Sequence, residues 1–397
     1  FNLSQGAKGL LAFLAVPLVA SLSDRYGRRP VLIAGTVTFG LPGVLLWAFE
    51  LYKSKESYMI FLVLSAVEGL TGAAGINGLA LTYVADTTCP TERAAVMGLV
   101  MGAGAAPAWI AAPLIFSKLD ESFGRVAFLR AYVVAVGLWV LCAVLTPESR
   151  PPQAEGDPLN LNPLRRFRVL CRNGPPVPGY GTTRKVFWLL FLSILLLYIG
   201  KLGFLFSLGL YASQEFGFTP TEAAWLQVAY GATQFLSQLS VAALAMVLQK
   251  KTLIFCGVVL GWFAVASVAV PDSPAGLLFV VEGVMGLSLV ARTVGSAMAS
   301  EVADPRFVGE AVGVLSSAVV LCSGLGPLLF GSLVHLFHPT AYPQAAFLVM
   351  AAVMAGGPVC ALLLPTDEQV EDHGEQQSVL YCGHGCHEED RACCAER

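Results

Sequence analysis

Long apolar stretches separated by short polar turns run along almost the whole chain. A stretch of about 20 apolar residues can cross the hydrocarbon core of a bilayer as a helix. Eleven such stretches occur, and together they predict an all-α integral membrane protein. Their approximate ranges are 2–22, 30–50, 58–84, 94–117, 126–146, 186–213, 221–248, 252–271, 274–300, 308–337 and 342–365.

The same pattern divides the chain into four parts. Residues 1–146 form a first transmembrane bundle, and residues 186–365 form a second. Residues 147–185 between them are rich in proline and arginine, which predicts a polar cytoplasmic linker. Residues 366–397 are polar and predict a disordered tail.

Composition supports a protein embedded in lipid. Only 13% of the residues are charged and 56% are hydrophobic, whereas soluble domains carry roughly a quarter charged residues. The net charge of −3 gives no reason to expect a nucleic-acid partner. No phosphate-binding loop, nucleophile elbow or metalloprotease motif occurs, so we expect neither an enzyme nor a cofactor.

The most polar turn between two apolar stretches covers residues 21–30. It holds three arginines, and short loops rich in Lys and Arg stay on the cytoplasmic side of a membrane. This orientation also places most of the 24 Lys and Arg residues in the cytoplasm. The turn therefore predicts the topology of the whole chain.

Segments of the first half recur in the second half in the same order. Glu68 is separated from Glu282 by the same number of residues as Pro113 from Pro327. Such parallel repeats predict two pseudo-symmetric bundles of six helices. The first half shows one helix fewer, so we expect a first helix to precede residue 1. The matching pairs are 67–72 with 281–286, 84–86 with 302–304, and 112–116 with 326–330.

The residues of the polar turn resemble a known loop. A small residue, Asp-Arg and Gly-Arg-Arg at these spacings are typical of the major facilitator superfamily, although Ala20 stands where that family usually has glycine. Residues 5–11, 83–93 and 324–327 resemble the branch of tetracycline-type proton antiporters and hippocampus-abundant-transcript transporters. The resemblance implies the major facilitator fold, with two six-helix bundles around a central cavity. It also implies secondary transport of a small organic solute by alternating access.

The resemblance further implies a conformational latch in the polar turn. In the family, the residues equivalent to Asp24, Arg28 and Asp86 form a charge relay that holds the two halves in one state. The alternative interpretation is that these charges only fix the topology and anchor the interface. The remaining residues of the expected latch are Arg25, Gly27 and Arg29.

Ionisable residues inside the spans are candidates for a proton or substrate site. Glu68 stands where the family often has arginine, so it could carry a proton, or it could form a fixed ion pair with Lys201. Lys8 and Arg292 lie nearer the span ends and could reach the interface. The other candidates are Glu282, Asn77, Tyr198, Gln227, Tyr230 and Gln234.

Small residues and prolines in two repeat-related helices predict either a hinge or close helix packing. These residues are Gly98, Gly102, Pro107, Pro113, Gly326 and Pro327. In the tail, soft ligands at close spacing could bind zinc or copper(I), or the tail could carry reduced or acylated thiols. The tail candidates are Cys382, His384, Cys386 and His387.

We therefore expect a monomeric, multi-pass secondary transporter that couples a small organic solute to H⁺. The sequence does not distinguish the plasma membrane from an internal membrane. The alternative is a transporter-like receptor or trafficking protein that acts through its linker and tail.

Overall fold

The structure is a computed structural model, and it is helical throughout the part of the chain that it describes. Apart from helices, that part holds one isolated bridge between Val177 and Gly181. The tail candidates from Cys382 onward and most of the linker lie outside the described residues. Those residues are 2–48, 57–70, 76–89, 92–149, 177–270, 275–303, 308–338, 340, 342–370 and 372–373.

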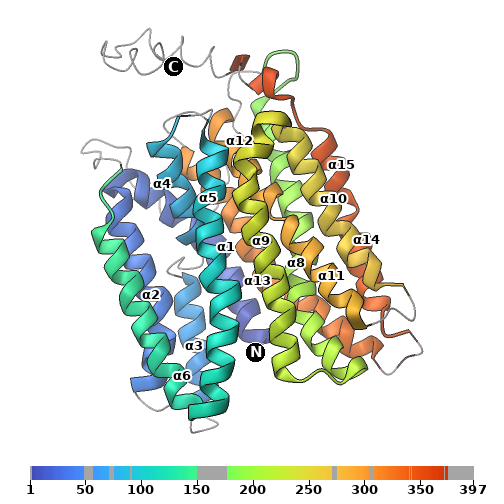
Figure 1. Cartoon of the computed structure of the whole chain (residues 1–397). Helices are drawn as coiled ribbons and strands as arrows, with labels where there is room; N and C mark the ends of the chain where they lie inside the picture. Colours follow the sequence, from blue (N-terminus) through green and yellow to red (C-terminus); the bar gives the residue numbers. More distant parts are fainter. Residues whose placement is uncertain are drawn as a thin grey trace.

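The helices form two groups that stand side by side in Figure 1. The first group comprises α1 (Asn2–Tyr26), α2 (Arg28–Ala48), α3 (Ser57–Leu70), α4 (Ile76–Thr87), α5 (Arg93–Ala105), the π-helix η3 (Ala106–Ala111) and α6 (Ala112–Leu145). The second comprises α8 (Thr183–Phe216), α9 (Pro220–Val247), α10 (Lys250–Val268), α11 (Ala275–Leu287), α12 (Val290–Val302), α13 (Val308–Phe337), α14 (Ala345–Met354) and α15 (Gly356–Leu362).

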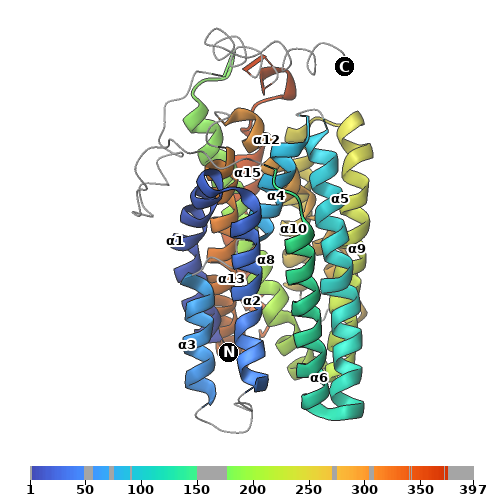
Figure 2. The same cartoon turned by 90° about the vertical axis from the view of Figure 1, so that its left-hand side faces the viewer.

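Length and apolar character mark seven helical stretches in the described part of the chain as able to cross a membrane. The chain is therefore an integral multi-pass protein, and the count of eleven spans stays a prediction. The predicted spans 94–117 and 126–146 fall on α5, η3 and α6. The backbone of α6 stays helical over the residues between the two spans, where we expected a non-helical turn. Figure 2 shows the chain reversing direction within this region at the lower end of the molecule.

Small residues allow helices of the two halves to approach closely. α1 packs along α13, and α5 packs along α9. A Cβ atom added to Gly9 would lie 2.6 Å from the Cα of Gly324, and one added to Gly98 would lie 2.6 Å from the carbonyl oxygen of Gln238. Side chains at these positions would force the halves apart.

The other predicted hinge or packing residues occupy similar places. Gly102 also faces Gln238, and a Cβ on Gly326 would lie 2.7 Å from the backbone nitrogen of Gly203 in α8. Pro107 lies in η3 and Pro113 in the first turn of α6, while Pro327 lies inside α13. The glycines thus stand at close helix contacts, which favours the packing interpretation.

The end of the linker is fixed to the C-terminal half. The hydroxyl of Tyr180 donates to the carbonyl oxygen of Leu363, just beyond α15. The side-chain amide of Gln369 donates to the carbonyl oxygen of Gly179 at 3.3 Å. Partial burial raises the pKa of the Tyr180 phenol, so the hydroxyl keeps the proton that it donates at physiological pH.

Candidate functional site

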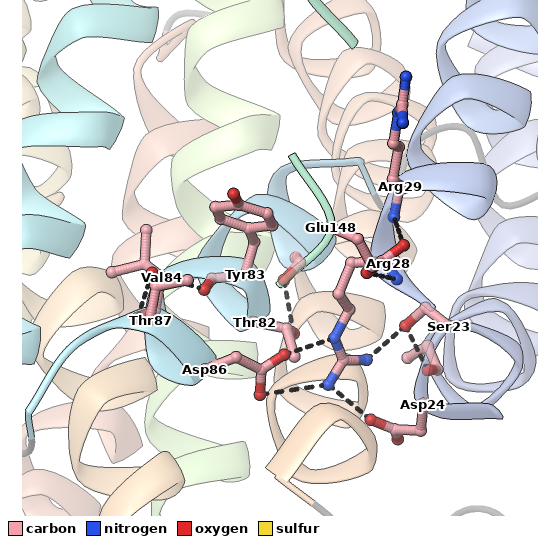
Figure 3. A network of polar contacts seen from close by, with 12 residues as sticks. Ser23, Asp24, Arg28, Arg29, Thr82, Tyr83, Val84, Asp86, Thr87 and Glu148 are labelled. Carbon is pink, nitrogen blue, oxygen red and sulfur yellow. Dashed lines mark hydrogen bonds and ion pairs between the residues drawn. The ribbon is translucent and has the colours of Figure 1, made fainter. Parts of the chain in front are cut away.

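Arg28 is the centre of a charged cluster at the predicted cytoplasmic end (Figure 3). Its Nη2 lies 2.6 Å from Oδ1 of Asp24, and its Nε lies 2.7 Å from Oδ2 of Asp86. Its Nη1 donates to the hydroxyl of Ser23 at 2.5 Å. The Arg28 side chain is only 1% exposed, so α1, α2 and α4 are joined through one buried guanidinium.

The turn that carries Arg28 is held by Glu148. Gly27 adopts a φ of 95°, a backbone conformation that favours glycine, and α2 begins directly after it. The Glu148 carboxylate then accepts the backbone N–H of Arg28 at 2.6 Å and that of Arg29 at 3.1 Å. A carboxylate at these free N–H groups stabilises the start of the helix.

Arg29 and Arg25 make other contacts. The guanidinium of Arg29 donates to the carbonyl oxygen of Val144 at 2.6 Å, near the end of α6. The guanidinium of Arg25 lies over the ring of Tyr26, 5.7 Å from its centroid. Of the expected latch residues, the structure therefore brings Asp24, Arg28 and Asp86 together and uses Gly27 for the turn.

Helix α13 of the other half covers this cluster. A Cβ atom added to Gly309 would lie 2.5 Å from Oδ1 of Asp24 and 2.9 Å from Nη1 of Arg28. One turn further on, a Cβ on Gly313 would lie 2.6 Å from the Cβ of Ala20. The cluster thus stands at the boundary between the two halves, with no space for a side chain at Gly309.

A second cluster in the C-terminal half repeats this arrangement. Lys250 begins α10, and its backbone N–H is accepted by the Asp367 carboxylate at 3.0 and 3.1 Å. Its Nζ lies 2.7 Å from Oε2 of Glu301, near the end of α12. Sequence reasoning did not identify this cluster, although Lys250 and Lys251 occupy the turn that corresponds to Arg28 and Arg29.

Arg93 forms a polar link between the halves at this end. It begins α5, and its Nη1 lies 3.4 Å from both the carbonyl oxygen and the hydroxyl of Ser300 in α12. These distances are long for hydrogen bonds, so the link is weaker than the Arg28 cluster.

Inside the bundle, Glu68 forms an ion pair with Lys8. The Lys8 ammonium also lies 5.6 Å from the centroid of the Phe39 ring. The described structure does not show the Glu68–Lys201 pair, one of the two alternatives, because the Lys8 side chain crosses from α1 to α3 and pairs with the Glu68 carboxylate. Lys8 does not turn toward the interface as we expected.

Lys201 lies fully buried in α8, at the centre of a polar group in the C-terminal half. Its ammonium donates to the hydroxyl of Ser288 at 3.1 Å and approaches the carbonyl oxygen of Met285 at 3.5 Å. The rings of Tyr198 and Tyr230 have their centroids 5.3 and 5.2 Å from the same nitrogen. A buried ammonium with such partners is held by cation–π attraction as well as by hydrogen bonds.

Glu282 and Arg292 complete this group. Glu282 in α11 is 2% exposed, and its Oε2 has no hydrogen-bond partner in the described structure. Arg292 is 8% exposed, and its guanidinium carbon lies 5.9 Å from the centroid of the Tyr198 ring. The expectation that Arg292 reaches the interface is wrong, because its side chain is buried against the Tyr198 ring.

The remaining candidates divide into buried and exposed residues. Gln234 is buried, and its Oε1 has no partner among the described residues. Asn77 and Gln227 are exposed and lie outside the buried group. Trp109, which the sequence did not single out, extends from η3 of the first half and meets the Tyr230 ring edge-on at 5.2 Å. The buried group therefore borders the boundary between the halves.

A family model for the major facilitator superfamily matches residues 2–200 and 190–380, which together span nearly the whole chain. The chain belongs to the major facilitator superfamily. The two matches cover the two helix groups in turn, as expected for a fold with two bundles.

Individual relatives agree with this assignment. The chain is 27% identical over 391 residues to hippocampus abundant transcript 1 protein of Homo sapiens, covering 96% of this chain and 72% of the relative. It is 34% identical over 163 residues to the class C tetracycline resistance protein of Escherichia coli, covering 40% and 38%. Both relatives come from the branch that the sequence motifs indicate.

A solved structure confirms the fold. The human organic anion transporter MFSD10 (TETRAN) aligns with a TM-score of 0.68 at 20% identity, covering 91% of this chain and 83% of that one. The family match and this shared fold together make the chain a membrane transporter of the major facilitator type.

Proposed function

We propose that this protein is a secondary active transporter that moves a small organic solute by alternating access and couples it to H⁺. The observation that carries this proposal is the Arg28 cluster. It joins three helices of one half and is covered by α13 of the other half. A device of this kind can hold the two halves together at one membrane face while the opposite face opens.

The energetics of the cluster support a latch. A buried charged group is favourable only while its partners are in place, because each unpaired charge carries a large desolvation penalty. Arg28 and its two carboxylates therefore have to stay paired while α13 covers them. Separating the halves admits water and weakens that requirement, which gives a two-state element.

The names of relatives support a small organic solute as the cargo. One relative is a tetracycline resistance protein, and the structural neighbour is an organic anion transporter. We extend only the general class, a small organic molecule, to this chain.

Proton coupling requires a carboxylate that can gain and lose a proton as the halves move. Glu68 and Glu282 are the repeat-related candidates. Glu68 is paired directly with Lys8, whereas Glu282 keeps one carboxylate oxygen without a hydrogen-bond partner in the described structure. We favour Glu282 as the proton carrier, with the Lys8–Glu68 pair as a fixed link between α1 and α3.

Reconstitution of the full-length protein tests this proposal. Proteoliposomes with a trapped pH dye would be exposed to a panel of organic anions, neutral solutes and lipophilic cations. We expect at least one solute to produce a pH change that protein-free vesicles lack. If no solute changes the internal pH and tracer solutes do not exchange either, the transport proposal is wrong.

A further inference from the structure

Charges in the buried group of the C-terminal half do not balance. Lys201 lies within electrostatic range of a second cation, Arg292, and of one carboxylate, that of Glu282. No ion pair joins either cation to a carboxylate in the described structure, and each cation instead faces tyrosine rings. A net positive charge in a buried site is costly until an anion enters it.

Unused polar atoms in the same group point to a missing ligand. The Lys201 ammonium has three N–H donors, yet it makes one good hydrogen bond, to Ser288, and one long contact. Glu282 is 2% exposed, and its Oε2 has no hydrogen-bond partner in the described structure. Buried polar groups are normally satisfied, so a group with spare donors and acceptors is suited to bind a molecule that supplies both.

Aromatic rings define the shape of the ligand. The ring centroids of Tyr198 and Tyr230 lie 5.3 and 5.2 Å from the Lys201 ammonium nitrogen. Trp109 of the other half adds a third ring against Tyr230. A flat ring can stack on such surfaces while a charged substituent meets the ammonium.

We propose that Lys201, Arg292, Tyr198 and Tyr230 form a binding site for an aromatic monocarboxylate. The carboxylate of the ligand pairs with Lys201 and Arg292, and its ring packs on the tyrosines. Glu282 repels a second negative charge, which selects a monoanion. Because Trp109 covers Tyr230 from the first half, separation of the halves opens the site. This inference rests on the proposed function in one respect, since it places the site on the transport path.

A matched series of three compounds tests the charge preference. Benzoate, benzamide and benzamidinium have nearly the same shape and carry charges of −1, 0 and +1. Thermal unfolding of the purified full-length protein in detergent reports binding, because a ligand that binds the folded state raises Tm. We expect a saturable rise with benzoate and none with the other two. The proposal is wrong if benzoate gives no rise, or if benzamidinium gives an equal one.

Variants then test the residues. Lys201→Met should weaken the apparent benzoate affinity about 10- to 100-fold, the range for a lost hydrogen bond to a charged group. The same substitution at the other intramembrane lysine, Lys8→Met, should leave the benzoate affinity within about threefold of that of the unchanged protein, because Lys8 pairs with Glu68 outside the proposed site. Equal losses in both variants would overturn the assignment. If Lys201→Met does not fold, Arg292→Gln replaces it, and the same loss is expected.

Flux separates this inference from the proposed function. Radiolabelled benzoate is offered to proteoliposomes beside the binding measurement. Benzoate that binds, while neither it nor any solute of the panel crosses faster than in protein-free vesicles, would contradict transport and leave the anion site standing. Benzamidinium that crosses while benzoate fails to bind would contradict the anion site and leave transport standing.

Discussion

Arg28 in the first half and Lys250 in the second begin corresponding helices, and each is held by carboxylates in the same two ways. The backbone N–H of each is accepted by an acid that follows the last helix of its own half, Glu148 or Asp367. The side chain of each pairs with an acid near a helix end, Asp86 in the first half. At the predicted cytoplasmic end, the two halves are thus built alike.

Deeper in the bundle the halves differ. Glu68 and Glu282 occupy the same position of the repeat, yet Glu68 has a direct ion pair with Lys8 and Glu282 has none in the described structure. The first half neutralises its buried carboxylate with a direct ion pair, whereas Glu282 in the second half belongs to a buried group with Lys201, Arg292 and tyrosine rings. The comparison supports our proposal that the repeated ends control the contact between the halves and that the second half binds the solute.

The largest expected effect is a difference in stability between variants of the two corresponding residues, Arg28 and Lys250. Arg28→Gln leaves two carboxylates buried without their partner, and breaking a buried pair costs about 3–5 kcal/mol. Lys250→Gln removes one ion pair from a side chain that is 13% exposed, so its loss should be smaller. Thermal unfolding in detergent should show a clearly larger fall in Tm for Arg28→Gln. Equal falls would mean that the Arg28 cluster is no more important than its repeat.

An intermediate effect is expected at the contact between α13 and the latch. A methyl group at Gly309 would press on Asp24 and Arg28, and overpacking of this kind costs about 1–3 kcal/mol. Gly309→Ala should therefore speed amide exchange in residues 23–29 about tenfold, as measured by mass spectrometry. Gly104→Ala is the control, because a Cβ there meets no atom within 4 Å. Unchanged exchange in Gly309→Ala would show that α13 does not hold the latch closed.

The smallest effect is expected from replacing the whole ion pair of the first half. An apolar pair of similar volume is often neutral or stabilising in place of a buried ion pair. The double variant Lys8→Met/Glu68→Leu should keep its Tm within a few degrees and its solute flux within about twofold. A tenfold loss of flux with an unchanged Tm would place this pair in the transport cycle.

The sequence predicted the features that depend on local patterns and missed those that depend on how the helices pack. Apolar length and the repeat predicted the fold, because both are properties of the chain read locally. The partners of Arg28 were predictable because the charged turn is short and the family motif names Asp86. The partner of Glu68 was not, because Lys8 lies on another helix and only packing decides which lysine reaches the carboxylate.

Two further features depended on three-dimensional contacts. Arg292 was expected at the interface because the sequence shows only its position along the span, whereas the structure buries its side chain against Tyr198. The covering of Asp24 and Arg28 by Gly309 depends on how α13 packs against α1, which no local pattern encodes.

The most direct test of the central claim compares Glu282→Gln with Glu68→Gln in proteoliposomes that contain a trapped pH dye. Each variant removes one carboxylate of the repeat-related pair and keeps its size. We predict that Glu282→Gln abolishes solute-dependent proton movement, while Glu68→Gln keeps at least about half of it. The reverse result, with coupling lost in Glu68→Gln and kept in Glu282→Gln, would contradict the assignment of the proton and solute site to the C-terminal half.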